Sequence, residues 1–482
     1  MDVSKSSNAV TDQGAGATQL RAGALNLVEV LMQAITHIAP GAGLILGIQF
    51  VVSQSGIASP LAFSIAFLIV LTLGISLTQL ARHLPSAGGY YTYLSRTVHP
   101  RAGFLTSWLY FLYDPTGAAI NIAFFGFLFE QTTKNLWGFD FPWWLSFLII
   151  TAFVSFMMFR GIKLAGRTLV ILGSLEILIL VALSLHGLFQ PGRGGFSFTP
   201  FLPSHAASTT GLFLGIVFSI FTFTGFESVA PLAEESKNPR RNLPRAIIGS
   251  ILIMGVFYIL ASWGVIIGWG TNDVNSLISS QQNPVFLLGQ RLWGGAWLLI
   301  LFSLLNSVIA VSIACNNAST RVFFGMARTG VLPKALATVH PKYKTPVGAA
   351  ILQTIITVVV GLGIGFWIGA DQEFFVLGVV VTLGLGLVYC AGNLGVFRYY
   401  RTERRAEFNW LLHLVFPLFS TVAILYVIYM SIVPLPAPPV VAAPFIVLVW
   451  LVIGIVLMLW LGRTGHTDWV SRAREVNIEV DG

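Results

Sequence analysis

The stretch ITHIAPGAGLILG, residues 35–47, interrupts the first apolar segment of the chain. Where a membrane-spanning helix ordinarily carries leucine, this stretch has His37, Pro40 and three glycines. Proline lacks a backbone N–H and its ring clashes with the preceding turn, so a regular helix cannot run through Pro40. Irregular backbone at membrane depth is tolerated only where it is buried in protein or lines a cavity. The stretch therefore predicts that the helix unwinds at about residues 38–43, leaving N–H and C=O groups for a ligand.

The composition excludes a soluble globular protein. Of 482 residues, 55% are hydrophobic and 10% are charged, whereas ordinary soluble domains are about 25% charged. Twelve apolar segments are long enough to span a bilayer, which takes about 20 residues each. These segments are residues 24–52, 59–81, 103–130, 142–159, 168–188, 210–234, 246–269, 295–320, 347–368, 374–397, 408–432 and 442–462.

The net charge of +8 is a topology signal. With the N-terminus in the cytoplasm, only three of the 27 lysines and arginines fall on the far side of the membrane: Lys134, Arg193 and Arg291. By the positive-inside rule this predicts a multi-pass protein of the cell membrane with both termini in the cytoplasm. We expect disordered cytoplasmic tails at 1–22 and 463–482, no cleaved signal peptide and no nucleic-acid partner.

A second interruption lies five segments after the first. Segment six reads GLFLGIVFSIFTFTGFESVAPLAEE, residues 211–235, with small and polar residues near mid-membrane. A repeat unit with an odd number of spans inserts its second copy upside down. Paired interruptions in corresponding spans of two inverted halves are typical of secondary transporters, whose substrate site lies between the halves. For either break alone, close helix packing through glycine is the alternative interpretation.

Four motifs resemble those of one known family. They are PSAGGYY at 85–91, Gly-Phe-Glu at 225–227, KNPRRNLP at 237–244 and ARTGVLP at 327–333. Together they resemble the amino acid–polyamine–organocation superfamily of permeases, over about residues 24–400 and more loosely over the last two spans. The resemblance implies an all-α, LeuT-type fold and alternating-access uptake or exchange of amino acids or amines. Its parts would be two inverted repeats of five helices at 23–190 and 209–400, with helices one and six broken, and two peripheral helices at 406–462.

The breaks and the resemblance together predict a substrate site. Many family members carry Gly-Ser-Gly in the first break, whereas this chain has Ala39-Pro40-Gly41-Ala42-Gly43, so a bound carboxylate would rely on backbone N–H groups. In relatives an aromatic residue near Phe221 closes over the substrate, so Phe221 and Phe223 are gate candidates. The predicted substrate-binding residues are Ile38, Ala39, Gly41, Ala42, Gly43, Asp114, Phe221, Thr224, Gly225 and Glu227.

Acidic residues inside the spans are costly and therefore functional by default. Asp114 precedes Pro115 in segment three, and Glu227 lies at the second break. Glu176 in segment five aligns where some proton-coupled relatives have lysine, so we expect proton coupling through Glu176, His37 and Glu227. No cluster of sodium ligands is evident between segments one and eight. Each residue also has a structural interpretation: Asp114 as an acceptor at the kink, Glu227 as a partner of freed N–H groups, Glu176 as a neutral acid and His37 as a packing residue.

Several function classes are disfavoured. We find no Walker-type loop, no regular polar stripe for a channel and no HExxH motif, and the histidines are scattered. Cys315 and Cys390 lie in apolar runs, so neither suggests a disulfide framework or a metal cluster. With no catalytic motif present, we expect no enzyme, no cofactor and no metal site. A secondary transporter for amino acids or small amines is the favoured function, with a non-transporting membrane sensor as the alternative class. Surplus buried carboxylates favour a cationic substrate, with a neutral amino acid permease or exchanger as the other possibility.

Overall fold

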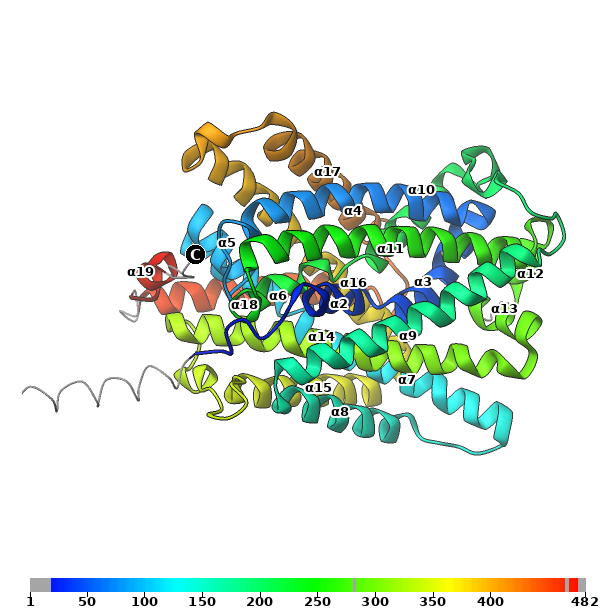
Figure 1. The fold of residues 1–482 in the computed structure, drawn as a ribbon, viewed down its shortest axis with the longest axis horizontal. Helices are drawn as coiled ribbons and strands as arrows, with labels where there is room; N and C mark the ends of the chain where they lie inside the picture. Colours follow the sequence, from blue (N-terminus) through cyan, green and yellow to red (C-terminus); the bar gives the residue numbers. More distant parts are fainter. Residues whose placement is uncertain (1–18, 281–282, 464–467, 476–482) are drawn as a thin grey trace, which may run out of the picture.

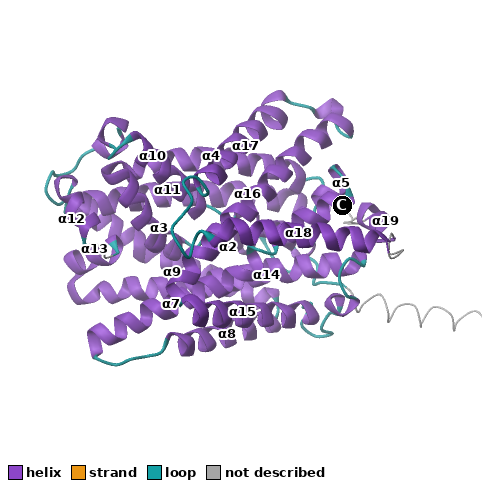
Figure 2. Cartoon of the chain, turned by 180° about the vertical axis from the view of Figure 1, so that it is seen from behind, coloured by secondary structure: helices purple, strands orange, loops and turns teal. Residues whose placement is uncertain are grey.

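The protein is described by a computed structural model over residues 19–280, 283–463 and 468–475. Across these residues it is helical, with two isolated β-bridges and no strand (Figure 2). Most residues of the two predicted tails lie outside the described ranges. The helices run side by side along the longest axis of the molecule (Figure 1), as expected for a bundle that crosses a membrane.

The helices of the first half cover the first five predicted segments and add a short helix between segments two and three. Their bounds are α2 (Leu27–Ile38), α3 (Pro40–Ser55), η2 (Gly56–Ala58), α4 (Ser59–Ala81), α5 (Tyr90–Thr97), α6 (Pro100–Tyr110), α7 (Asp114–Trp137), α8 (Trp143–Arg160) and α9 (Ile162–Phe189). Two short 3₁₀ turns follow, η3 (Thr199–Phe201) and η4 (Pro203–His205).

The second half begins with another interrupted element. Its bounds are α10 (Thr209–Thr222), η5 (Phe226–Glu235), α11 (Pro239–Trp269), η6 (Thr271–Asp273), α12 (Val274–Ser279), α13 (Pro284–Trp293), η7 (Gly294–Trp297), α14 (Leu298–Thr329), η8 (Lys334–Ala337), α15 (Val347–Ile368) and α16 (Ala370–Thr402). The last part comprises η9 (Arg405–Glu407), the π-helical η10 (Leu411–Val415), α17 (Phe416–Met430), α18 (Ala442–Arg463) and α19 (Asp468–Glu475).

Eleven stretches of the described chain are long and apolar enough to cross a membrane. The first of them, Leu27–Ala81, has 55 residues and contains the first two predicted segments. The protein is thus a multi-pass helical membrane protein. The count of twelve spans, the inverted repeat and the orientation of the termini stay predictions.

The break in the first segment is confirmed, but it is narrower than expected. Helix α2 ends at Ile38, Ala39 adopts the left-handed region with φ 57°, and α3 begins at Pro40. Gly41, Ala42 and Gly43 are therefore helical rather than unwound. The reason is that proline suits the first position of a helix, where its fixed φ fits and its missing N–H has no partner to lose.

The second break is longer than the first. Helix α10 ends at Thr222, and a turn leads to η5, a 3₁₀ helix that includes Pro231. Gly225 has φ 123°, which disfavours any side chain. A Cβ at Gly225 would lie 2.7 Å from the carbonyl carbon of His37. The two breaks are therefore packed directly against each other through Gly225.

A third interruption lies at Pro115, where the sequence indicated at most a kink. Segment three was predicted as one span over 103–130, but the structure divides it into α6 and α7, with Asp114 the first residue of α7. Pro115 follows and cannot donate to the preceding turn, which separates the two helices. Asp114 thus lies at a helix start rather than inside a continuous helix.

The broken elements lie in the middle of the bundle. Helix α2 packs against α9, α11, α14 and η5, and α14 also packs against α7. In Figure 1, α2 and α14 are central, whereas α8 and α15 form the lower edge and α17 lies at the upper edge. The interruptions are therefore surrounded by protein, where irregular backbone is tolerated.

Candidate functional site

The N-terminal end of α3 is capped by side chains from two other helices. The N–H of Gly41 donates to Glu176 Oε2 on α9 (3.1 Å), and the N–H of Ala42 donates to Ser307 Oγ on α14 (2.9 Å). The N–H of Gly43 donates to the Ala39 carbonyl (2.6 Å). The donors that we expected to hold a substrate carboxylate thus have partners within the protein, and one of these partners is itself a carboxylate.

Close packing explains both glycines of this helix start. A Cβ at Gly41 would lie 2.8 Å from Ser307 Cβ and 2.9 Å from Glu176 Oε2, and one at Gly43 would overlap the Tyr258 hydroxyl. Gly41 therefore lets α3 approach α14 closely, which is the packing role that the sequence left as an alternative. The Ser307 hydroxyl and the Ser303 backbone carbonyl also lie near this contact, which the sequence analysis did not identify.

Tyr258 on α11 connects the two breaks. Its hydroxyl lies 3.2 Å from the carbonyl oxygen of Ile38 and 3.2 Å from that of Thr222. These carbonyls end α2 and α10 and lack helical partners, as the last carbonyls of any helix do. Since a hydroxyl carries one proton, Tyr258 can donate to only one of them at a time. This role could not be predicted from the sequence, because a tyrosine inside an apolar segment is usually a packing residue.

Glu227 stabilises the second break from within. Its Oε2 accepts from the N–H of Gly225 (3.1 Å) and from the hydroxyl of Tyr389 on α16 (2.8 Å). The ring of Tyr389 stacks on Phe226 at 5.7 Å between centroids. Glu227 Oε1 is buried and has no hydrogen-bond partner within the described chain. Glu227 therefore takes the structural role that the sequence left open, and it keeps one oxygen for another partner.

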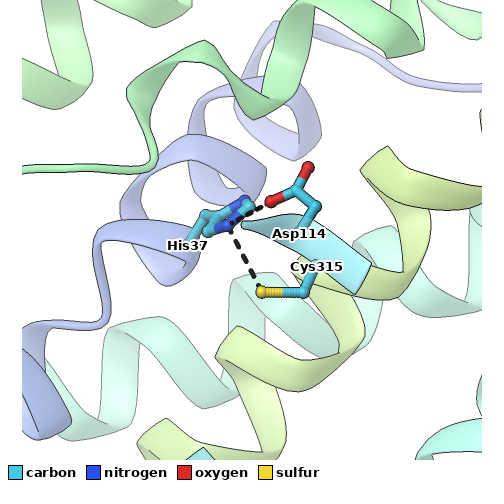
Figure 3. Close-up of side chains that lie close together, drawn as sticks. All are labelled: His37, Asp114 and Cys315. Carbon is cyan, nitrogen blue, oxygen red and sulfur yellow. Dashed lines mark hydrogen bonds and ion pairs between the residues drawn. The ribbon is translucent and has the colours of Figure 1, made fainter. Parts of the chain in front are cut away.

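Asp114 lies against two partners from the chain itself (Figure 3). Its Oδ1 is 3.0 Å from His37 Nε2, and its Oδ2 accepts from the hydroxyl of Tyr110. His37 stacks on Tyr113, with ring centroids 5.4 Å apart, and its Nε2 is also 3.3 Å from Cys315 Sγ. Asp114 and His37 are thus partners, which the sequence did not predict because 76 intervening positions separate them. A substrate amine reaching Asp114 would have to displace His37.

The two gate candidates differ in their surroundings. Phe223 is fully buried and packs edge-on against Tyr258, with 5.1 Å between ring centroids. Phe221 is half-buried, and its carbonyl accepts from the Thr224 hydroxyl at 2.9 Å. Phe221 therefore has more freedom to move than Phe223, and the gate role of both stays a prediction.

The site is closed around its own side chains. The pocket beside Glu227 is lined by Tyr90, Tyr110 and Pro231, and it is too narrow for a water molecule. At the end of the bundle where α2 begins, Arg321 forms a buried bidentate pair with Glu235, at 2.7 and 3.2 Å. Leu25 exchanges backbone hydrogen bonds with the segment 235–237. Entry of a ligand therefore requires helices to move.

A helical protein with long apolar spans and broken helices that meet in its middle is a multi-pass membrane protein with a polar interior site. A family model described as amino acid permease matches residues 29–478. The chain therefore belongs to the amino acid permease family.

Individual relatives agree with this assignment. The chain is 28% identical over 341 residues to the low-affinity putrescine importer PlaP of Escherichia coli K12, covering 67% of this chain and 71% of PlaP. It is 28% identical over 336 residues to the branched-chain amino acid permease BcaP of Bacillus subtilis 168, covering 64% and 69%. It is 24% identical over 432 residues to the aromatic amino acid transport protein AroP of Escherichia coli K12, covering 86% and 90%. The family and these relatives are permeases, so the protein is a membrane permease.

Proposed function

We propose that this permease is a proton-coupled secondary transporter that prefers small amines or basic amino acids, moved by alternating access. The substrate would lie between the two breaks, beside Asp114 and Glu227. The residues predicted from the sequence at both breaks would surround the substrate once the helices around the breaks move apart.

The observation that carries this proposal is the set of carboxylates Asp114, Glu176 and Glu227. All three residues are buried, and none is more than 1% exposed. The imidazole of His37 is a basic group that contacts one of the three, Asp114. In a medium of low dielectric constant, surplus negative charge attracts a cationic ligand strongly. A substrate amine would relieve the cost of burying these groups.

The start of α3 supports the same preference. A helix N-terminus is a natural site for an anion, but here the Gly41 N–H is taken by Glu176 and the Ala42 N–H by Ser307. A substrate without a carboxylate does not need these donors. This favours an amine over a zwitterion.

We propose Glu176 as the coupling group. Its Oε1 has no hydrogen-bond partner in the described chain, and its Oε2 holds the end of α3. Protonation would remove the buried charge and weaken its hold on the Gly41 N–H, which links proton binding to the position of the broken helix. Glu227 and His37, the other expected coupling residues, are engaged by Tyr389 and Asp114. The Ser307 hydroxyl and the Ser303 backbone carbonyl supply oxygen atoms near the start of α3, so sodium is the ion to test against.

We also propose that the chain has twelve spans in the cell membrane, with an inverted repeat and cytoplasmic termini. The distribution of lysine and arginine supports the orientation. The direct packing of the two breaks through Gly225 supports two halves that intertwine.

Counterflow in proteoliposomes tests the transport proposal. Purified full-length protein would be reconstituted with unlabelled substrate inside and labelled putrescine, lysine, leucine or phenylalanine outside. We expect transient accumulation with putrescine or lysine and a weaker signal with leucine and phenylalanine. Binding without counterflow for every compound would indicate a sensor. Stronger counterflow with leucine or phenylalanine would favour the neutral amino acid permease or exchanger. The similarity to BcaP and AroP supports this second possibility.

The coupling proposal needs a second measurement. Glu176→Gln keeps the shape of the side chain but cannot exchange a proton, so uptake driven by a pH gradient should fall while counterflow persists. Uptake that requires a sodium gradient and ignores the pH gradient would contradict proton coupling.

A further inference from the structure

Three side chains with metal-binding atoms meet in the middle of the bundle. His37 comes from the last turn of α2, Asp114 from the start of α7 and Cys315 from the middle of α14 (Figure 3). All three residues are at least nine-tenths buried. One nitrogen, one oxygen and one sulfur atom from them lie within 4.8 Å of one another. We call these residues the His–Asp–Cys cluster.

Hydrogen bonding does not satisfy this cluster. His37 Nε2 lies 3.0 Å from Asp114 Oδ1 and 3.3 Å from Cys315 Sγ, so two groups share one ring nitrogen. An imidazole nitrogen carries at most one proton, so it cannot donate to both. Asp114 Oδ1, the oxygen that faces His37, is buried and accepts no hydrogen bond within the described chain. A cation placed between the three atoms would be contacted by all of them at once.

We propose that the His–Asp–Cys cluster binds a thiophilic divalent cation of the Zn²⁺ class. Thiolate, imidazole and carboxylate are the ligand types that zinc takes, with bonds of about 2.0–2.3 Å, and a tetrahedral ion spaces its ligand atoms roughly 3.3–3.7 Å apart. The nitrogen–oxygen and nitrogen–sulfur separations of 3.0 and 3.3 Å are a few tenths of an ångström from these values. Binding would release the thiol proton of Cys315 to solvent, because the thiolate is the ligand form.

The surroundings would support a bound ion. The Tyr110 hydroxyl donates to Asp114 Oδ2, the carboxylate oxygen that the ion does not need. Such outer hydrogen bonds orient metal ligands and raise affinity. Three protein ligands also leave a fourth position open, as in zinc sites that exchange a ligand.

The position of the cluster predicts what the ion would do. It would join α2 to α7 and α14 immediately before the break at Ala39. It would also occupy Asp114, which a substrate amine needs under the proposed function. The bound cation should therefore inhibit transport and compete with amine substrates. Metal binding itself does not depend on the proposed function, and a direct binding assay tests it separately.

Cobalt absorption on purified full-length protein in detergent tests the site. Co²⁺ bound to a thiolate gives a sulfur-to-metal charge-transfer band in the near ultraviolet, and Zn²⁺ should abolish the band by displacement. The chain contains two cysteines, so Cys390→Ser on α16 is a matched control. We expect the band in the wild type and in Cys390→Ser, and its loss in Cys315→Ser with metal affinity at least about tenfold lower.

The variants are expected to fold. Cys315 packs closely against Gly117, where an added Cβ would lie 2.8 Å from its Sγ. Because serine is smaller than cysteine, the exchange creates no clash at this contact. Melting temperatures without metal would verify this, and Cys315→Ala serves as a second variant if Cys315→Ser is unstable. Absence of the band in the wild type at millimolar Co²⁺, or a band that persists in both Cys315 variants, would overturn the proposal.

Discussion

Asp114 lies between His37 and Tyr110, so its role depends on which group faces it in each state of the transport cycle. In the closed structure His37 holds the position that a substrate amine would take. The exchange of His37 for a substrate amine would keep a polar partner beside the carboxylate throughout the cycle. This limits the cost of burying it.

Asp114→Asn should weaken the binding of diamines and basic amino acids by about ten- to a hundredfold, because a charge-assisted hydrogen bond is worth roughly 1.5–3 kcal/mol. Asparagine is nearly isosteric, so folding should survive. Scintillation proximity binding with labelled putrescine and leucine would measure the change, which should be larger for putrescine. Unchanged affinity for every substrate together with a lower melting temperature would make Asp114 a structural partner of His37 instead.

Gly41→Ala tests the packing of the first break. The added Cβ would meet Ser307 and Glu176 at 2.8 and 2.9 Å, and overpacking of this kind costs about 1–3 kcal/mol. We therefore expect a lower melting temperature in addition to any loss of binding. The control is Gly363→Ala in α15, where a Cβ meets nothing within 4 Å. Loss of binding at full stability would restore the expected role of Gly41 as a ligand-lining residue.

The ends of α2 and α10 are held together by one hydroxyl on α11. Tyr258→Phe removes the donor shared by the Ile38 and Thr222 carbonyls and leaves both buried without it. Loss of such a partner costs about 1–3 kcal/mol. The melting temperature should fall for Tyr258→Phe and stay unchanged for Tyr429→Phe, whose ring is exposed on α17. Equal melting temperatures for the two variants would show that Tyr258 does not stabilise the breaks.

The sequence predicted where the helices break but not what holds the broken ends. Pro40 and Gly225 act on their own backbone, so their effect is readable from the residue type and its neighbours. The partners of the breaks, such as Glu176, Ser307 and Tyr258, come from helices far along the chain, and one sequence does not specify which faces meet. The His37–Asp114 contact was missed for the same reason. A kink at Pro115 was one interpretation of the sequence, but the full division of segment three was not predicted, because proline is often tolerated inside membrane helices.

The end of the bundle where α2 begins is closed by contacts between distant parts of the chain. Leu25 pairs with the segment 235–237, and Arg321 of α14 forms a buried ion pair with Glu235. Together they connect the start of α2, the end of η5 and α14. We expect this end to face the cytoplasm, so its separation would open the inward path.

Glu235→Gln should destabilise this closure, because removing one partner of a buried ion pair costs about 3–5 kcal/mol. The melting temperature should fall, and limited proteolysis near Leu25 should become faster. Asp140→Asn breaks the exposed pair with Lys134 and should change neither, since such pairs are worth about 0–1 kcal/mol. Equal behaviour of the two variants would show that Arg321 and Glu235 are not what closes this end.

Under the proposed function, Glu176 would also limit how tightly a substrate carboxylate binds. The Glu176 side chain is fixed to α9 and cannot diffuse away from the Gly41 N–H, so it acts as a hydrogen-bond acceptor at an effective concentration on the order of millimolar or higher. An amino acid that brings its own carboxylate to this helix end must outcompete it, whereas an amine avoids the competition. Zwitterions should therefore bind weakly and leave quickly, and their transport should depend on abundance outside the cell rather than on tight capture.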